Sequence, residues 1–572
     1  MLLKLVAQRA ALRQFCRAVN MARFDGKVVI VTGSSSGIGA GTAVLFAREG
    51  AKVTITGRKQ DGLEATKRCI IDAGGKEDNL NVVIADVTDA SGREKVVSST
   101  VQKWGQIDIL VNNAGGMLRD DKGCGGVTAS VDVLEKTMDL NVYSVVQMVQ
   151  LARPYLAKTK GEVVNVSSIA GQPKGSPKFM YYAMAKAALD QMTRSLALEL
   201  IPEGVRVNSV SPGAVVTRFC QSSGLSDAEA AKFYERFASS PDSLPIREIG
   251  QPEDIANIIA FLADRRVSRY IIGQTIVADG GSMLVIASNA SVFKEENRFC
   301  TLLSRIRSSS GIGAETAVLF AKEGAKVTIT GRKKDGLEAT KRCILNAGGK
   351  EDDINAVVAD VTDASGREEI ISSTVQKWGK IDILVNNAGG MLRDTNGSAD
   401  ASASVDVLRK TMDLNVCSVV HLIQLARPYL VKQKERWLTF PVLVGSLKGH
   451  QNSCTMRCQK PLLDQMTRSL AVDLIAEGVR VNSVSPGAVV TRFMQTSGVT
   501  DADASKFYEI FASSADSLPI REIGQPEDIA NVIAFLADRR ASRYIIGQTI
   551  IADGGSMLVT ASDVTAFGDE FH

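Results

Sequence analysis

The chain has 572 residues, 45% of them hydrophobic and 23% charged, with nine cysteines and a net charge of +4. This composition excludes a disordered chain, and the length predicts two large domains. No apolar run is long enough for a transmembrane helix, so we expect no membrane partner. Nine scattered cysteines form no disulfide framework and favour a reducing compartment.

The basic character of the chain is concentrated at its start. Residues 1–23 carry five basic side chains and no acidic one, which exceeds the net charge of +4. The rest is close to neutral, so we expect no nucleic-acid partner. Residues 1–20 mix apolar and basic side chains as mitochondrial presequences do, yet they lack serine and threonine. Three interpretations stay open: import into mitochondria, a disordered tail on a cytoplasmic protein, or an untranslated stretch before a start at Met21.

The chain is a tandem repeat of one unit. A segment beginning SSSGIGA starts at Ser34 and recurs at Ser308, an offset of 274 residues. Two further long segments repeat at the same offset, without insertions between them. We therefore divide the chain into a basic extension (1–23), a first copy (24–290) and a second copy (296–572).

Strand-like and helix-like segments alternate along the first copy. The predicted strands are Lys27–Val31, Val53–Thr56, Val82–Ala85, Ile109–Val111, Val163–Val166, Val205–Val207 and Thr275–Val277. The predicted helices include Ile38–Arg48, Asp61–Ala73, Val133–Leu156 and Tyr182–Leu200. Such alternation is typical of α/β folds with a parallel sheet covered on both faces. We expect two tandem Rossmann-like, doubly wound domains, each with its ligand crevice at the carboxyl ends of the strands.

A glycine-rich loop joins the first predicted strand to the first helix. Gly33 allows a tight turn, Gly37 lets a pyrophosphate approach the backbone, and Gly39 allows close packing of helix and strand. Ser35 and Ile38, in the same loop, are further candidate cofactor contacts. The helix N-terminus favours the anion. Because the loop lies between a strand and a helix, it predicts dinucleotide binding.

The end of the second strand predicts which dinucleotide binds. NAD-binding sheets usually place an acidic residue here, whereas this chain has Gly57 followed by Arg58 and Lys59. Two cations can accept a 2′-phosphate, so NADP is favoured over NAD. Asp86, at the end of the third strand, is a candidate contact to the adenine edge, or a simple strand-end cap.

Tyr182 and Lys186 are spaced to share one face of a predicted helix. They follow Ser168, at the end of a predicted strand, by 14 and 18 residues. A hydroxyl, a phenol and an ammonium are thus predicted to meet at the crevice. The phenol has an ordinary pKa near 10, which a nearby lysine and a nicotinamide cation would lower.

Together these motifs resemble the short-chain dehydrogenase/reductase (SDR) family, over residues 24–285. The glycine loop, Asn112-Asn113-Ala114-Gly115, Asn141, Ser168, Tyr182, Lys186 and Pro212-Gly213 occur in the family's order. The resemblance implies that Tyr182 is the general acid/base, that Ser168 orients the carbonyl, and that Lys186 holds the nicotinamide ribose. It further implies a proton-relay water at Asn141 and cofactor contacts from Asn113, Pro212, Gly213 and Thr217.

Two details of the first copy qualify the resemblance. The spacing from Ser168 to Tyr182 is one residue longer than is common, and Tyr181 has no lysine four residues on. Residues Val215–Pro245 correspond to the family's substrate lid and carry the aromatic residues Phe219, Phe233, Tyr234 and Phe237. These rings either pack the lid itself or form an apolar substrate wall.

The second copy has lost the predicted chemistry. At the offset of 274, Gly33 becomes Arg307, Ser168 becomes Val442 and Tyr182 becomes Met456, whereas Lys460, Asn415 and Arg332 are kept. The differences concentrate in residues 435–459, and a shifted reading frame of plausible codons would restore the first copy's motif. A frame-shifted block or gene-model error, and true degeneration into a structural partner, both stay open. His450, Cys454 and Cys458 in this block lack a fourth ligand, so we expect no metal site.

The sequence therefore predicts an NADP(H)-dependent carbonyl reductase or alcohol dehydrogenase, active in the first copy, acting on a small carbonyl or alcohol substrate. The second copy would be a catalytically inactive pseudo-domain. The alternative is a non-catalytic dinucleotide-binding or scaffold protein. The resemblance implies association through the two long helices near 132–157 and 182–203, either between the copies as an intramolecular pseudo-dimer or in a homo-oligomer.

Overall fold

The computed structural model describes two ranges of the chain, one in each copy. The first is 22–285, apart from 122, 124, 126–128, 173–178, 223–225 and 242. The second is 305–559, apart from 308–309, 391, 393–404, 432–453, 493 and 496–498. The N-terminal extension and most of the altered block at 435–459 therefore lie outside the described residues.

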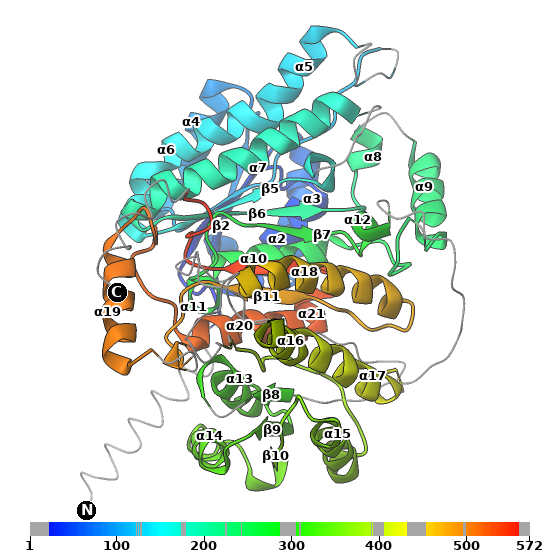
Figure 1. Ribbon diagram of the computed structural model, residues 1–572. Helices are drawn as coiled ribbons and strands as arrows, with labels where there is room; N and C mark the ends of the chain where they lie inside the picture. The colour runs from blue at the N-terminus through cyan, green and yellow to red at the C-terminus, as the bar shows by residue number, and fades with distance from the viewer. Residues whose placement is uncertain are drawn as a thin grey trace, which may run out of the picture.

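The first copy is built on a seven-stranded parallel sheet in the order β3-β2-β1-β4-β5-β6-β7 (Figure 1). Its strands are β1 (Val28–Val31), β2 (Lys52–Gly57), β3 (Leu80–Ile84), β4 (Ile109–Asn112), β5 (Glu162–Val166), β6 (Arg206–Pro212) and β7 (Thr275–Ala278). All seven predicted strands are present, and the predicted α/β fold class is confirmed. The order reverses direction between β1 and β4, where doubly wound sheets open their ligand crevice.

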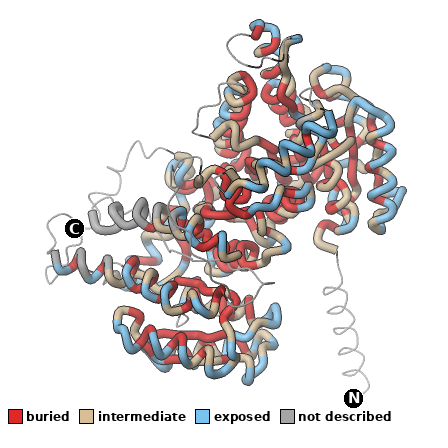
Figure 2. The backbone as a smooth tube through the Cα atoms, turned by 90° about the vertical axis from the view of Figure 1, so that its right-hand side faces the viewer, coloured by how far each residue is buried: buried red, intermediate tan, exposed pale blue. Residues whose placement is uncertain are grey.

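Helices cover both faces of this sheet. They are α2 (Gly37–Arg48), α3 (Gln60–Asp72), α4 (Ala90–Trp104), α5 (Val131–Met138), α6 (Ser144–Thr159), α7 (Met180–Leu200) and α10 (Pro252–Ala263). Neighbouring β1 side chains alternate between faces, since Val29 and Val31 pack with α2 and α10, whereas Ile30 packs with α4 and α6. Figure 2 shows the outer helices buried on their inner sides and exposed on their outer sides.

The region predicted as one helix, Val133–Leu156, contains a break in its helical pattern. A π-helical turn, Asp139–Tyr143, separates α5 from α6 and carries Asn141.

Further along, the predicted lid contains the short helices α8 (Phe219–Ser222) and α9 (Asp227–Ser239). A short helix α12 (Ser282–Val285) follows β7. No described helix is long and apolar enough to cross a membrane.

The second copy keeps the helices but divides its strands into two sheets. The strands β8 (Arg305–Arg307), β9 (Val327–Gly331) and β10 (Ile354–Val358) form one sheet, and β11 (Ser483–Pro486) pairs with β12 (Thr549–Ala552). The helices are α13 (Gly311–Lys322), α14 (Lys334–Asn346), α15 (Ala364–Trp378), α16 (Val405–Met412), α17 (Ser418–Leu430), α18 (Cys454–Ile475), α19 (Asp501–Ser513) and α20 (Pro526–Ala537). Residues 383–386, which correspond to β4, are described but form no strand.

Strand β8 also pairs differently from its counterpart. In the first copy Val31 lies opposite Ile55, whereas the equivalent Arg305 lies opposite Thr328, one residue earlier than the repeat requires. As a result, Arg307, which replaces Gly33, continues the strand opposite Thr330. The tight turn that opens the first copy's glycine loop is therefore replaced by extended chain at this position.

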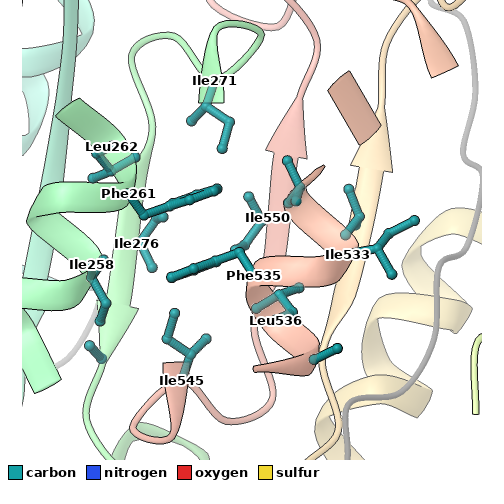
Figure 3. Packing of buried hydrophobic residues seen from close by; sticks show 14 of the residues in the cluster. Ile258, Phe261, Leu262, Ile271, Ile276, Ile533, Phe535, Leu536, Ile545 and Ile550 are labelled. Carbon is teal, nitrogen blue, oxygen red and sulfur yellow. The ribbon is translucent and has the colours of Figure 1, made fainter. Parts of the chain in front are cut away.

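The two copies meet mainly through α10, α20 and the short helices α11 (Arg265–Ser268) and α21 (Arg539–Ser542); of the long helices that the resemblance implied, α18 adds a smaller contact with α12. At the centre, the rings of Phe261 and Phe535 stack with centroids 3.7 Å apart and planes 4° apart (Figure 3). Two arginine–carboxylate pairs flank the stack, Arg269 with Asp528 and Arg543 with Asp254, each with N–O distances of 2.7 Å or less. The interface is thus nearly symmetric between copies.

Candidate active site

The glycine loop of the first copy adopts the conformation that its residues predict. Gly33 has φ of +64°, and a Cβ there would lie 2.8 Å from the Cα of Ala114. Gly37 has φ of +58°, and a Cβ there would lie 2.9 Å from the Cγ2 of Thr217. Larger residues at these positions would be strained and would fill the space beside the loop.

The amino end of helix α2 is open toward this loop. Its first residue is Gly37, and the side chain of the preceding Ser36 makes no capping hydrogen bond. The first backbone N–H groups of a helix have no partner inside the helix, and they attract anions. A loop whose glycines have no side chains, followed by an uncapped helix N-terminus, leaves room and free N–H donors for a pyrophosphate. These residues can therefore hold the dinucleotide that the sequence predicts.

Asn113 ties the glycine loop to the end of β4. Its side-chain Nδ2 donates to the carbonyl oxygens of Thr32 (2.9 Å) and Gly33 (3.0 Å). The Thr32 hydroxyl oxygen in turn accepts from the backbone N–H groups of Asn113 and Ala114, both at 3.0 Å. Thr32, which directly precedes the first glycine of the motif, is a positioning residue that was not among the predicted site residues.

The predicted cofactor-specificity residues lie together at the ends of β2 and β3. The guanidinium of Arg58 lies 3.7 Å from the carboxylate of Asp86, and the Arg58 side chain is 72% exposed. Asp86 also accepts hydrogen bonds from the backbone N–H and hydroxyl of Thr88, at 2.9 and 2.8 Å. Burial alone would raise the pKa of Asp86, but these hydrogen bonds and Arg58 outweigh it and lower the pKa. Lys59 is exposed at the start of α3.

Tyr182 and Lys186 lie on one face of α7, and both are buried. The side chain of Ser168, which follows β5, lies close enough to Tyr182 to act on its pKa. The Lys186 Nζ donates to the carbonyl oxygen of Val166 at 2.9 Å and lies 5.7 Å from the Tyr182 ring centroid. The helix and the end of β5 therefore bring the predicted phenol, hydroxyl and ammonium together.

Burial dominates the electrostatics of this pair. It raises the pKa of Tyr182 to about 12, with the nearby Ser168 hydroxyl acting in the opposite direction. Burial also lowers the pKa of Lys186 to about 8, against the attraction of Asp190. Desolvation of the phenolate thus outweighs the effect of the protein groups near Tyr182, and the lowering of its pKa by a nicotinamide cation stays a prediction.

The neighbouring Tyr181 points away from this cluster. Its hydroxyl donates to the backbone carbonyl of Ala129 at 3.1 Å, and its ring packs with Ala129 and Val133. Tyr182 instead lies against Phe219 of the lid, with ring centroids 5.4 Å apart. Of the other lid aromatics, Tyr234 donates its hydroxyl to the Val215 carbonyl at 3.0 Å, and Phe233 stacks on Phe237.

Asn141 is held by the backbone around it. Its Nδ2 donates to the carbonyl oxygens of Gly116 and Thr137, both at 2.9 Å, and its Oδ1 accepts from the Gly116 N–H at 3.1 Å. A Cβ on Gly115 would lie 2.8 Å from the Asn141 Oδ1 and 3.1 Å from the Lys186 Nζ. Gly115 thus leaves open the space between the amide and the ammonium.

The end of β6 completes the crevice. Pro212 is the last residue of β6, and the N–H of Gly213 donates to the Ala278 carbonyl at 2.9 Å. A Cβ on Gly213 would lie 2.7 Å from that of Asp279, so this approach requires glycine. Thr217, which follows, lies against Gly37 of the glycine loop. The residues predicted from the ends of six strands, β1 to β6, therefore line one edge of the sheet.

The second copy retains parts of this arrangement. Asn415 repeats the bonds of Asn141, with both amide atoms at 2.9 Å from the backbone of Gly390. Val442 and His450 lie outside the described residues, and Met456, Cys454, Cys458 and Lys460 fall in the part of α18 where only the backbone is described. Among the described residues, no group of three or more side chains could hold a metal ion.

A family model described as "Enoyl-(Acyl carrier protein) reductase" matches the chain twice, at residues 33–283 and 306–557. The chain belongs to the short-chain dehydrogenase/reductase family. Members of this family are oxidoreductases of alcohol and carbonyl groups that use NAD(P)(H), so this chain is an SDR oxidoreductase. The double match also agrees with the tandem repeat.

Several SDR proteins resemble about half of this chain. The 3-oxoacyl-[acyl-carrier-protein] reductase of Thermotoga maritima is 35% identical over 46% of this chain and all of its own length. The human dehydrogenase/reductase SDR family member 4 is 35% identical over 45% of this chain and 87% of its own length. A Caenorhabditis elegans SDR of unknown function, solved with cofactor, is 51% identical over 46% of this chain and 98% of its own, with a TM-score of 0.46.

Proposed function

We propose that the first copy is an NADP(H)-dependent carbonyl reductase or alcohol dehydrogenase in which Tyr182 is the general acid/base. The observation that carries this proposal is the buried phenol of Tyr182, which has the Ser168 side chain and the Lys186 ammonium beside it. A phenol whose pKa is raised to about 12 stays protonated at neutral pH, and it can donate a proton to a substrate.

In the reductive direction each residue has a separate task. A bound NADPH would supply the hydride to the carbonyl carbon. Ser168 would hold the carbonyl oxygen by a hydrogen bond, and Tyr182 would give that oxygen its phenolic proton. The Lys186 ammonium would stabilise the phenolate left behind and bond the nicotinamide ribose. Asn141, fixed through the Gly116 backbone, would hold the water that returns a proton to the site.

The residues proposed to hold the cofactor follow from the same crevice. Gly33, Ser35, Gly37, Ile38 and Gly39 would surround the pyrophosphate, while Asn113 keeps this loop against β4. Arg58 and Lys59 would bind the 2′-phosphate, and Asp86 would face the adenosine. Pro212, Gly213 and Thr217 would border the nicotinamide. The preference for NADP over NAD is supported by the exposed guanidinium of Arg58 at the end of β2.

The substrate we propose is a small carbonyl or alcohol compound with an apolar portion. Phe219 contacts the Tyr182 ring, so a molecule bound at the Tyr182 hydroxyl would also meet this apolar side chain.

We propose a cytoplasmic location, with mitochondrial import through residues 1–20 as the alternative.

For the second copy we propose a structural rather than catalytic role, which is the scaffold alternative applied to that copy alone. Its Tyr544 hydroxyl donates to the backbone carbonyl of Ala214, close to Thr217, and this contact favours such a role. We keep 24–290 and 296–572 as the boundaries of the two copies.

The test is a screen of the full-length chain against a panel of carbonyl compounds, with oxidation of NADPH or NADH as the readout. We expect consumption of NADPH with at least one ketone or aldehyde, and a lower kcat/KM with NADH. Reduction that proceeds equally well with NADH would contradict the cofactor preference. A chain that binds NADPH but reduces no member of a broad panel would favour the non-catalytic alternative.

A further inference from the structure

The second copy contains a cavity of about 350 Å³ at the carboxyl ends of β9 and β10. The described residues that line it are Thr330–Arg332 at the end of β9, Ala359–Thr362 after β10, and Ala388, Gly390, Leu392, Lys410, Asp413 and Leu414, the last two at the start of the π-helical turn. The volume falls in the range of small-molecule sites, and the carboxyl edge is where doubly wound sheets bind ligands.

Every residue that lines this cavity has an identical counterpart in the first copy. The thirteen lining residues all match the residue 274 positions earlier, including Arg332 with Arg58 and Asp360 with Asp86. The counterparts of Ser168 and Tyr182 have changed, by contrast, and so has that of Gly33. The second copy has therefore kept the side chains that line this cavity and lost the hydroxyl and the phenol of the catalytic end, where Asn415 and Lys460 remain.

The polar groups of the cavity also keep their geometry. The Arg332 guanidinium lies 3.6 Å from the Asp360 carboxylate, and the Arg332 side chain is 62% exposed. Asp360 accepts hydrogen bonds from the N–H and hydroxyl of Thr362, at 3.0 and 2.9 Å. These contacts repeat those of Arg58, Asp86 and Thr88. A planar cation next to a carboxylate suits a ligand that has both a phosphate and hydrogen-bonding hydroxyl or base groups.

The part of the crevice that would bind a pyrophosphate differs between the copies. Arg307 replaces Gly33 and is extended, opposite Thr330, because β8 pairs one residue out of register. An arginine cannot take the left-handed conformation of Gly33 without strain. Compared with the first copy, the second copy therefore offers a dinucleotide the same contacts at its adenosine end but not those at its pyrophosphate.

We propose that the second copy binds an adenosine nucleotide carrying a 2′-phosphate, the half of NADP that lies beyond the pyrophosphate, without turning it over. The 2′-phosphate lies on Arg332, and the adenosine fills the cavity beside Asp360. The full dinucleotide binds there no more tightly than this half. The inference rests on the NADP preference proposed for the first copy, because Arg332 is assigned its ligand by its equivalence to Arg58.

The test is calorimetric titration of the full-length chain with adenosine 2′,5′-bisphosphate, after one equivalent of NADPH has filled the first copy. We expect one further site per chain. The Arg332→Ala variant should lose this site, while its tight NADPH site provides the check that the chain is folded. Titration with NADPH alone should give one tight site.

Two results would overturn the inference. One is the absence of further binding once NADPH is bound, or further binding that survives Arg332→Ala. The other is two tight NADPH sites per chain, since this would require a working pyrophosphate loop in the second copy. Failure of the proposed function is distinguishable, because it would appear as no NADPH-dependent carbonyl reduction, whatever the count of bisphosphate sites.

Discussion

The hydroxyl of Tyr544, in the second copy, donates a hydrogen bond to the carbonyl oxygen of Ala214, in the first, at 2.7 Å. The same oxygen accepts from the N–H of Gly250, and the Tyr544 ring lies so close to Gly250 that a Cβ there would be 2.7 Å from it. Ala214 begins the segment that leads to Thr217 beside the glycine loop. The second copy therefore supports the backbone at the edge of the first copy's crevice.

This relationship has a mirror image that provides a matched control. Tyr270, in the first copy, donates to the carbonyl of Ala488, in the second, at 2.8 Å. Tyr544→Phe and Tyr270→Phe remove equivalent hydrogen bonds, and each should lower the free energy of unfolding by about 1 kcal/mol. Only Tyr544→Phe should raise the KM for NADPH, because only it loosens the segment before Thr217. Steady-state kinetics check this, and equal changes in KM for both variants would refute a positioning role for Tyr544.

Arg58→Ala should reduce the affinity for NADPH by roughly 10- to 100-fold, which corresponds to the loss of a charge-assisted contact to a phosphate. The kinetic parameters with NADH should stay close to those of the wild type, because NADH has no 2′-phosphate. This internal control separates loss of the contact from damage to the fold. If the variant lost activity with both cofactors in the same proportion, Arg58 would have no specific role in NADP recognition.

Burial of Lys186 predicts a pH-dependent effect on stability. Its pKa is lowered from 10.5 to about 8, which corresponds to a destabilisation of roughly 3 kcal/mol while the side chain is charged in the folded state. Between pH 8 and 10.5 the unfolded chain holds a proton that the folded chain has released, so stability rises with pH in this window. Below pH 8 both states are charged and the full destabilisation is present.

Lys186→Met should therefore raise the free energy of unfolding at pH 7. The gain should be about 1–3 kcal/mol, because the hydrogen bond to the Val166 carbonyl is lost at the same time. The advantage over the wild type should shrink as the pH rises from 8 to 10.5. Denaturant unfolding at several pH values measures this, with Lys158→Met at an exposed position as the control. A variant less stable than the wild type at pH 7 would contradict the account.

Much of the first copy's architecture could be predicted from its sequence. All seven strands were found because buried parallel strands are short β-branched runs such as Val28–Val31, bounded by glycines. The crevice followed from the alternation of strands and helices. The π-helical turn at Asn141 could not be predicted, because its apolar spacing continues that of α5 and α6.

The contacts between the two copies could not be predicted from sequence patterns either. Phe261 and Phe535 occupy positions that look like ordinary core positions of amphipathic helices, and nothing in their spacing shows that the two rings stack on each other. The register of β8 was equally hidden, since it depends on how Arg305–Arg307 pairs with β9 rather than on composition. The burial of Tyr182, which raises its pKa, could likewise not be read from the spacing of charged residues in the sequence.

The central claim is that the phenol of Tyr182 transfers the proton, and its neighbour offers the sharpest comparison. The measurement is NADPH oxidation with a reducible carbonyl compound by wild type, Tyr182→Phe and Tyr181→Phe. Tyr182→Phe should lower kcat by roughly 10²- to 10⁴-fold while it still binds NADPH, because a general acid is lost. Tyr181→Phe, which loses only the bond to the Ala129 carbonyl, should stay within an order of magnitude of wild type. Carbonyl reduction that survives Tyr182→Phe would contradict the account.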